Sequence, residues 1–153
     1  MKKLAMLGLV VLMVFGLITE GSAAEKTISV LLFSDEARYL ETKNAILEQL
    51  KKAGFAEPAV RYTVESAGGN KARAAELAQK VSASKPDMVI AIGTSVAVAA
   101  AKEIKAIPLV FSMVYDPVDS KIAESWSSSG NNTTGSSPRI PMAKILGTLK
   151  ELA

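Results

Sequence analysis

Short apolar runs alternate with longer amphipathic stretches along most of the chain. Residues 28–33 form a near-continuous apolar run of strand length, which is typical of a parallel strand covered on both faces, and residues 88–92 form another buried strand. Residues 59–64 and 109–112 are predicted as two further strands. Between them, apolar residues recur every three or four positions, which is the period of an amphipathic helix. The predicted helices run from Tyr39 to Ala53, from Asn70 to the break at Pro86-Asp87, and from Ser95 to Lys105.

The pattern becomes weaker after Pro117. Residues 120–126 are compatible with a short helix, residues 127–132 form a polar loop, and Thr133-Thr134 is compatible with a small fifth strand. A final helix is predicted from about Pro141 to the end of the chain, and its apolar face consists of Ile145, Leu146, Leu149 and Leu152. Strands that alternate with helices in this way predict an α/β fold, an open doubly wound parallel sheet with the flavodoxin-like strand order 2-1-3-4-5.

The first 24 residues have the features of a Sec-type signal peptide. Lys2 and Lys3 precede an apolar run over residues 4–18, and small residues at Ser22 and Ala24 fit the −3 and −1 positions of a cleavage site. The run is shorter than the ~20 apolar residues of a membrane-spanning helix, and without cysteine the chain has no site for a lipid anchor. We therefore expect cleavage after Ala24, release from the membrane, and a periplasmic location for residues 25–153.

Composition removes several classes of function. The 153 residues include no Cys and no His, so a disulfide, a thiolate nucleophile, a zinc finger and an imidazole base are all excluded. The chain has 18 Lys and Arg against 15 Asp and Glu, and two of these basic residues and one acidic residue lie in the leader. The remaining charge is nearly balanced, so we expect no nucleic-acid partner, and we expect neither enzymatic activity nor a cofactor or metal.

A ligand crevice is expected beyond the carboxyl ends of the strands, where the strand order reverses. The loop after the third strand contains Gly93, Thr94 and Ser95, which would place two hydroxyl groups beside the free N–H groups that open the next helix. This arrangement suits a carboxylate or a phosphate. The alternative is that Thr94 or Ser95 only caps that helix.

The loops after the first and fourth strands supply the other candidate residues. Ser34 and Asp35 follow the first strand, and Asp35 with Glu36 either forms an acid–base pair or complements the helix dipole. Tyr115 and Asp116 follow the fourth strand, where Asp116 either holds the ammonium group of a ligand or forms a turn with the following proline.

Several motifs, in this order, resemble the substrate-binding proteins of ABC transporters, in the family that includes tryptophan- and tyrosine-binding members. The motifs are Val30-Leu31-Leu32-Phe33, Lys85-Pro86-Asp87, Ala91-Ile92-Gly93-Thr94-Ser95, Ile107-Pro108-Leu109-Val110-Phe111, Asp116-Pro117-Val118 and Gly130-Asn131-Asn132-Thr133-Thr134-Gly135. The resemblance implies one lobe of a type I periplasmic-binding protein, which holds a small amino-acid-like or organic solute, often an aromatic amino acid, between two lobes. It also implies an ABC transporter permease as partner, and by position it assigns the ligand to Thr94, Ser95, Tyr115 and Asp116.

Two departures from the family pattern concern the solute and the second lobe. Members often have a His-Pro pair after the first strand, whereas this chain has Ser34-Asp35, which leaves the identity of the solute open. The chain also resembles only the first lobe of a longer protein, either through a truncated reading frame or as a fragment.

Two other functions compete with solute binding. One is a stand-alone flavodoxin-like or receiver-like signalling module, but a receiver requires an acidic residue after its third strand, where this chain has Gly93-Thr94-Ser95. The other is a small hydrolase, which would need a base for its serine that a chain without histidine does not offer in the usual form.

Overall fold

The computed structural model describes residues 25–140 and 142–152. Its helices and strands follow one another as β1 (Lys26–Leu32), α2 (Ala37–Lys52), β2 (Val60–Ser66), α3 (Lys71–Ser84), β3 (Met88–Ile92), α4 (Thr94–Glu103), β4 (Leu109–Ser112), β5 (Thr133–Gly135) and α5 (Met142–Leu152). All strand pairs are parallel, and the order in the sheet is β2-β1-β3-β4-β5. The predicted fold class and strand order are confirmed. The proposed signal peptide, Pro141 and Ala153 lie outside the described residues.

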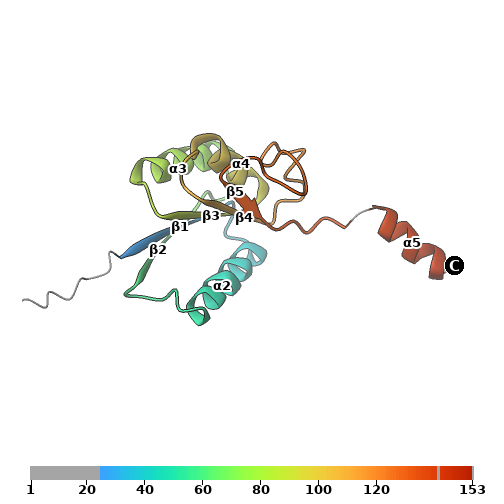
Figure 1. Ribbon diagram of the computed structural model, residues 1–153, viewed down its shortest axis with the longest axis horizontal. Coiled ribbons are helices and arrows are strands. Elements are labelled where there is room, and N and C mark those ends of the chain that lie inside the picture. Colours follow the sequence, from blue (N-terminus) through green and yellow to red (C-terminus); the bar gives the residue numbers. More distant parts are fainter. Residues whose placement is uncertain (1–24, 141, 153) are drawn as a thin grey trace, which may run out of the picture.

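Helices cover both faces of the sheet, as Figure 1 shows, with α2 on one face and α3 and α4 on the other. Alternate residues of the central strands therefore enter two separate cores. Leu31 and Val89 pack with α3 and α4, whereas Val30, Ile90 and Ile92 pack on the side of α2. This burial on both faces explains why the strands appear in the sequence as unbroken apolar runs.

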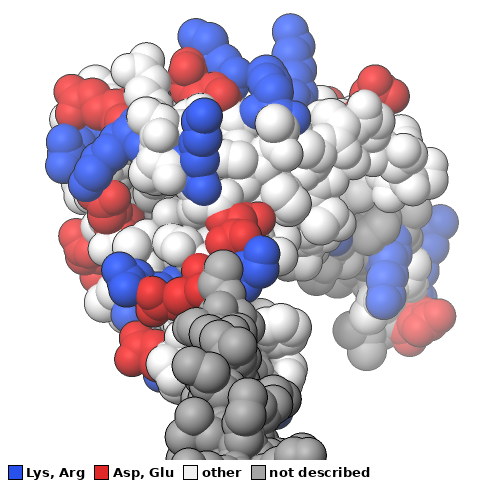
Figure 2. Space-filling model, turned by 60° about the vertical axis from the view of Figure 1, so that its left-hand side comes forward, with Lys and Arg blue, Asp and Glu red and all other residues white. Residues whose placement is uncertain are grey.

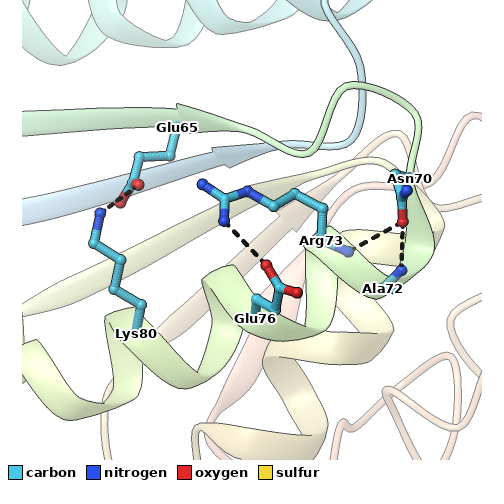
Figure 3. Close-up of polar contacts among 6 residues, drawn as sticks. All are labelled: Glu65, Asn70, Ala72, Arg73, Glu76 and Lys80. Carbon is cyan, nitrogen blue, oxygen red and sulfur yellow. Dashed lines mark hydrogen bonds and ion pairs between the residues drawn. The ribbon is translucent and has the colours of Figure 1, made fainter.

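The predicted helix ends are present. The Asn70 side chain accepts hydrogen bonds from the backbone N–H groups of Ala72 (2.8 Å) and Arg73 (3.1 Å), so it caps α3 as expected (Figure 3). At the end of α2, Gly54 adopts a φ of +91°. The backbone N–H of Phe55 then returns to the carbonyl of Leu50 at 2.9 Å, which closes the helix with a left-handed cap.

Asp87 fastens the beginning of β1 to the beginning of β3. Its carboxylate accepts hydrogen bonds from the backbone N–H of Thr27 and from the Lys26 ammonium, both at 2.8 Å, and its own N–H donates to the Thr27 carbonyl at 2.9 Å. The Lys26 hydrogen bond, followed by that of the Thr27 N–H, lowers the pKa of Asp87. Acidic and basic side chains lie side by side on the face that includes the start of β1 (Figure 2).

We predict that Asp87→Asn flattens the acid side of the stability profile. Because the pKa of Asp87 is lowered by folding, its ionised form stabilises the protein above the pKa of the unfolded chain, which is ~3.9. That contribution disappears as pH falls through the lower pKa of the folded state. Urea unfolding across this range should show a smaller loss of stability on acidification in the variant. Identical profiles for the two proteins would contradict the assignment.

The short helix predicted over residues 120–126 is absent, and the segment consists of turns. The Asp116 carboxylate accepts the N–H groups of Val118 and Asp119 at 3.0 Å each, which is the geometry of an N-cap, and a turn begins there. Lys121 then has a φ of +57°, and a left-handed residue cannot continue a right-handed helix. The turn that Asp116 opens therefore ends at Lys121, and the apolar spacing does not extend it.

The two asparagines of the Gly130-Asn131-Asn132-Thr133-Thr134-Gly135 motif join loops to each other. The Asn131 amide donates to the carbonyl of Ile122 at 2.9 Å. The Asn132 amide donates to the carbonyls of Ile104 (3.1 Å) and Ile107 (2.6 Å), in the connection that leads from α4 to β4. The motif therefore has a structural role that fixes the start of β5.

Helix α5 forms as predicted but lies apart from the sheet, beyond an extended segment that follows β5 (Figure 1). Of its apolar face, the side chains of Leu146 and Leu149 are 52% and 56% exposed. The side chains of Ile145 and Leu152 lie outside the described set. Within the part of the chain that the structure describes, no helix is long and apolar enough to cross a membrane.

Candidate functional site

The carboxyl ends of β1, β3 and β4 reach the same level of the sheet. Leu32 is in register with Ile92, and Ile92 is in register with Ser112. The ladder continues one residue further, because the N–H of Phe33 donates to the Ile92 carbonyl (3.0 Å) and that of Gly93 to the Ser112 carbonyl (2.9 Å). The three loops therefore begin at the same end of the sheet, and the strand order reverses between β1 and β3. This is the position at which open α/β sheets bind ligands.

Gly93 allows the loop after β3 to pass close to the aromatic side chains of the neighbouring loop and helix. Its φ is +109°, and a Cβ at this position would lie 2.9 Å from the Phe33 Cβ and 2.9 Å from the Tyr39 ring. The Phe33 and Tyr39 rings meet edge to face with centroids 6.3 Å apart. The contact of Tyr39 with Gly93 was not evident from the sequence, where Tyr39 was only one member of an apolar helix face.

Thr94 and Ser95 are the first two residues of α4, and Gly93 occupies the N-cap position. The structure has no side-chain capping hydrogen bond at this helix end, so the alternative role of these residues as side-chain caps is not realised. Both residues are partly buried. The first N–H groups of a helix have no acceptor within the helix, so this helix start offers backbone donors beside the carboxyl end of β3, where the two hydroxyl-bearing residues also lie.

The loop after β1 leads to two carboxylates, of which Glu36 forms an ion pair and Asp35 has no partner among the described residues. The Ser34 hydroxyl is buried and lies 3.3 Å from a carboxylate oxygen of Glu36, whose second oxygen pairs with Arg38 at 2.9 Å. Asp35 is exposed, and its carboxylate forms neither a hydrogen bond nor an ion pair with the described residues. Glu36 therefore forms an ion pair with Arg38, whereas Asp35 is the acidic group at this end of the sheet that can contact a ligand cation.

Asp116 has internal partners for both carboxylate oxygens. The side chain is only 10% exposed; Oδ1 accepts the two backbone N–H groups of the following turn and Oδ2 accepts a hydrogen bond from Arg139. The turn that the sequence offered as an alternative is thus present. The ammonium group of a ligand would reach Asp116 only by displacing Arg139.

Arg139 is a residue that sequence reasoning missed. It follows β5, 23 positions after Asp116, and its guanidinium also lies 5.3 Å from the centre of the exposed Trp126 ring. Nearby, the Ser137 hydroxyl donates to the carbonyl of Tyr115 at 2.6 Å, while the Tyr115 side chain is exposed. Arg139 and Ser137 therefore attach the segment after β5 to the loop after β4.

We predict that Asp116→Asn lowers stability and leaves solute affinity nearly unchanged. The variant loses the ion pair with Arg139, and a hydrogen bond to a charged group contributes about 2 kcal/mol. The measurement is urea unfolding beside a solute titration of the folded protein, with the exposed neighbour variant Asp119→Asn as control. An Asp116→Asn protein of normal stability but strongly reduced affinity would instead assign this carboxylate to the ligand.

A hollow of about 170 Å³ lies beside β5, and Phe111, Trp126 and Ser137 are among the residues that line it. Sites for small molecules usually measure ~300–1,000 Å³, so this hollow lies below the usual range. Among the described residues, no group of three or more acidic side chains is arranged to hold a metal ion. The end of the sheet that borders the crevice thus offers donors for an anion, one carboxylate for a cation, and aromatic side chains.

The comparisons with known proteins concern the family and the fold. A model of the family "ABC transporter substrate binding protein" matches residues 27–153. The chain is 25% identical, over 132 residues, to a protein of Clostridioides difficile named "tyrosine-binding protein", and the match covers 86% of this chain and 38% of that protein.

Two solved structures have a similar fold. The ligand-free, open form of a substrate-binding protein with adhesive properties from Clostridium difficile has a TM-score of 0.77 and 26% identity, covering 82% of this chain and 43% of that one. An ABC domain from Streptococcus pneumoniae in complex with L-Trp has a TM-score of 0.75 and 22% identity, covering 79% and 41%. The chain spans about two fifths of these proteins, and its sheet matches one of their lobes. The chain belongs to the ABC transporter substrate-binding protein family.

Proposed function

We propose that the chain forms the first lobe of an extracytoplasmic receptor that delivers a small amino-acid-like solute to an ABC transporter permease, and that it performs no covalent chemistry. The observation that supports this most is that hydrogen-bond donors and a carboxylate lie at the same end of the sheet, beside the crevice. Thr94 and Ser95 present hydroxyl and backbone donors at the start of α4, and Asp35 presents a carboxylate that has no partner among the described residues. A zwitterion has the complementary carboxylate and ammonium groups. Family membership favours this function over the receiver-like alternative.

An aromatic amino acid is the solute class that we propose. One relative is named for tyrosine, and one similar lobe belongs to a protein solved with L-Trp. Two aromatic side chains lie at the same end of the sheet, Tyr115 exposed and Phe33 partly buried. Either ring could stack on the ring of such a solute. We assign the solute carboxylate to Thr94 and Ser95, and the ammonium to Asp35.

A single lobe can supply only part of the contacts of a solute that is enclosed between two lobes. The chain spans about two fifths of its relatives, so we expect it to bind a free amino acid weakly. Affinity in the millimolar range is still measurable by NMR and is sufficient to rank related solutes.

Three indole compounds test the proposed function on this chain. L-tryptophan has both charged groups, tryptamine lacks the carboxylate, and indole-3-propionate lacks the ammonium. We expect L-tryptophan to bind most tightly, and we expect Asp35→Asn to remove its advantage over indole-3-propionate but not its advantage over tryptamine. Equal binding of all three compounds would show that the charged groups are not recognised and would overturn the assignment.

We further propose that the protein is exported and that residues 1–24 are removed. The positive start, the apolar run and the small residues before Glu25 support a cleaved leader. The exported protein should begin at Glu25 when its N-terminus is sequenced. Replacing Ala24 by a bulky residue such as Phe should block cleavage. An intact N-terminus in the secreted fraction of the unaltered protein would contradict this proposal.

A further inference from the structure

Strand β2 forms one edge of the sheet and exposes its outer side. It has seven residues, from Val60 to Ser66, and among the described strands it pairs only with β1. Helix α2 packs over β1, β3 and the start of β2, where Val60 and Tyr62 join its apolar cluster, but Val64 lies outside that cluster. As a result, Val64 is 44% exposed and Phe55, which precedes the strand, is 51% exposed. Such an edge can accept a further strand.

The backbone of β2 shows which residues face outward. The carbonyl of Ala59 accepts the N–H of Lys26 (3.0 Å), and the N–H of Ala67 donates to the Leu32 carbonyl (2.9 Å), so the odd-numbered residues of this stretch face β1. The even-numbered residues Tyr62, Val64 and Ser66 turn their N–H and C=O groups to the outside. Among the described residues, none bonds to these outward backbone groups.

We propose that two copies of the chain pair through β2, antiparallel and about a two-fold axis at Thr63. In this register, Tyr62 of one copy lies opposite Val64 of the other, and the two residues exchange N–H···O=C bonds through their free backbone groups. An aromatic side chain opposite a β-branched one is a favourable cross-strand pair. Thr63 lies opposite Thr63 of the second copy, which is also a favourable pair.

The charges on β2 are complementary in the same register. Arg61 of one copy lies opposite Glu65 of the other, on the face that bears α3. Within one copy, Glu65 already pairs with Lys80 of α3 at 2.6 Å (Figure 3), and Arg61 pairs with Glu25 at 2.5 Å. Pairing of two copies would join these contacts into a row of alternating charges, Lys80, Glu65, Arg61 and Glu25, on each side of the axis. Isolated edge charges usually prevent strand pairing, but charges that complement themselves select a second copy of the same chain.

This edge lies away from the solute crevice and from the exit of the chain. The crevice is at the carboxyl ends of β1, β3 and β4, whereas the pairing uses the side of β2. The chain leaves the sheet after β5, which is the opposite edge, and α5 lies beyond that edge (Figure 1). Pairing through β2 therefore leaves room for solute and for further protein.

Val64→Pro tests the backbone part of the proposal. Proline removes the outward N–H of Val64 but no hydrogen bond to β1, and proline is tolerated on an edge strand when its nitrogen faces outward. In sedimentation equilibrium of the exported chain at about 100 µM, a concentration that detects weak association, we expect a dimer. We expect the variant to dissociate at least about tenfold more readily, because two symmetry-related hydrogen bonds are lost.

Charge reversal tests the register. Arg61→Glu and Glu65→Arg should each weaken the dimer, because like charges then face each other, and the double variant Arg61→Glu/Glu65→Arg should restore it. Circular dichroism of each variant checks that the lobe is folded. A wild-type protein that remains monomeric at this concentration would overturn the proposal. It would also be overturned by a dimer that Val64→Pro leaves intact, in particular one that Leu146→Glu on α5 abolishes.

Discussion

Gly93→Ala is expected to destabilise the lobe by about 3 kcal/mol. Two effects add at this position: the φ of +109° is strained for any residue with a Cβ, and the new Cβ would lie 2.9 Å from both the Phe33 Cβ and the Tyr39 ring. Phe33 directly follows β1 and Tyr39 lies in α2. Both side chains pack in the core, so neither can move without disturbing it. Urea unfolding of the variant measures the loss.

Two other glycines separate the two effects. Gly69 has a φ of +78° with open space around it, so Gly69→Ala reports the cost of the backbone conformation alone. Gly147 has no unusual φ and no neighbour within 4 Å, so Gly147→Ala in α5 should be neutral or slightly stabilising. If Gly93→Ala costs no more than Gly69→Ala, the close approach to Phe33 and Tyr39 does not constrain the crevice.

Thr94→Val combined with Ser95→Ala is expected to lower solute affinity by about tenfold to a hundredfold. Each hydrogen bond to a charged ligand group contributes roughly 1.5–3 kcal/mol, and the two substitutions remove hydroxyl donors while keeping most of the shape. Because Gly93 is the N-cap and neither hydroxyl caps α4, stability should hardly change. The measurement is a titration with L-tryptophan beside thermal unfolding.

Asn70→Ala is the matched control, because Asn70 is a true N-cap on α3. Its loss should reduce stability by about 1 kcal/mol and leave affinity unchanged. If the double variant behaves like Asn70→Ala, with lower stability and normal affinity, the hydroxyls have only a structural role.

The central sheet could be predicted from the sequence because burial on both faces leaves a direct signal. Residues 88–92 and 109–112 were identified with the bounds that the structure shows. Strand β2 extends two residues beyond its predicted end, since Glu65 and Ser66 pair with Leu31 and Leu32 although they are polar. Backbone pairing decided that boundary, and it has no counterpart in the hydropathy pattern.

The contacts of the crevice could be predicted only in part. The predicted strand order places the loops that contain Ser34, Gly93 and Asp116 at the same end of the sheet, so this grouping follows from the topology alone. The pairing of Asp116 with Arg139 joins residues far apart in the sequence, and no spacing rule indicates such a contact. The same limit applies to Tyr39, whose periodicity shows that it is buried but not that it packs on Gly93.

The turns at residues 120–126 and the position of α5 show two other limits. Apolar spacing favoured a helix before Trp126, but the turn that Asp116 caps ends at Lys121, whose φ of +57° interrupts a right-handed helix. In α5 the helix itself was predicted correctly, while an amphipathic period does not specify which surface covers the apolar face.

Titration of the 15N-labelled chain with L-tryptophan, followed by NMR, tests the central claim most directly. We predict that the largest changes in amide shift, at ligand concentrations up to about 10 mM, occur at Thr94 and Ser95 and in the loop after β1 that contains Asp35. The amides of β2 and α3 should move little. An absence of shifts at this concentration, or shifts centred on the hollow beside β5, would contradict the account of a solute crevice between β1 and β3.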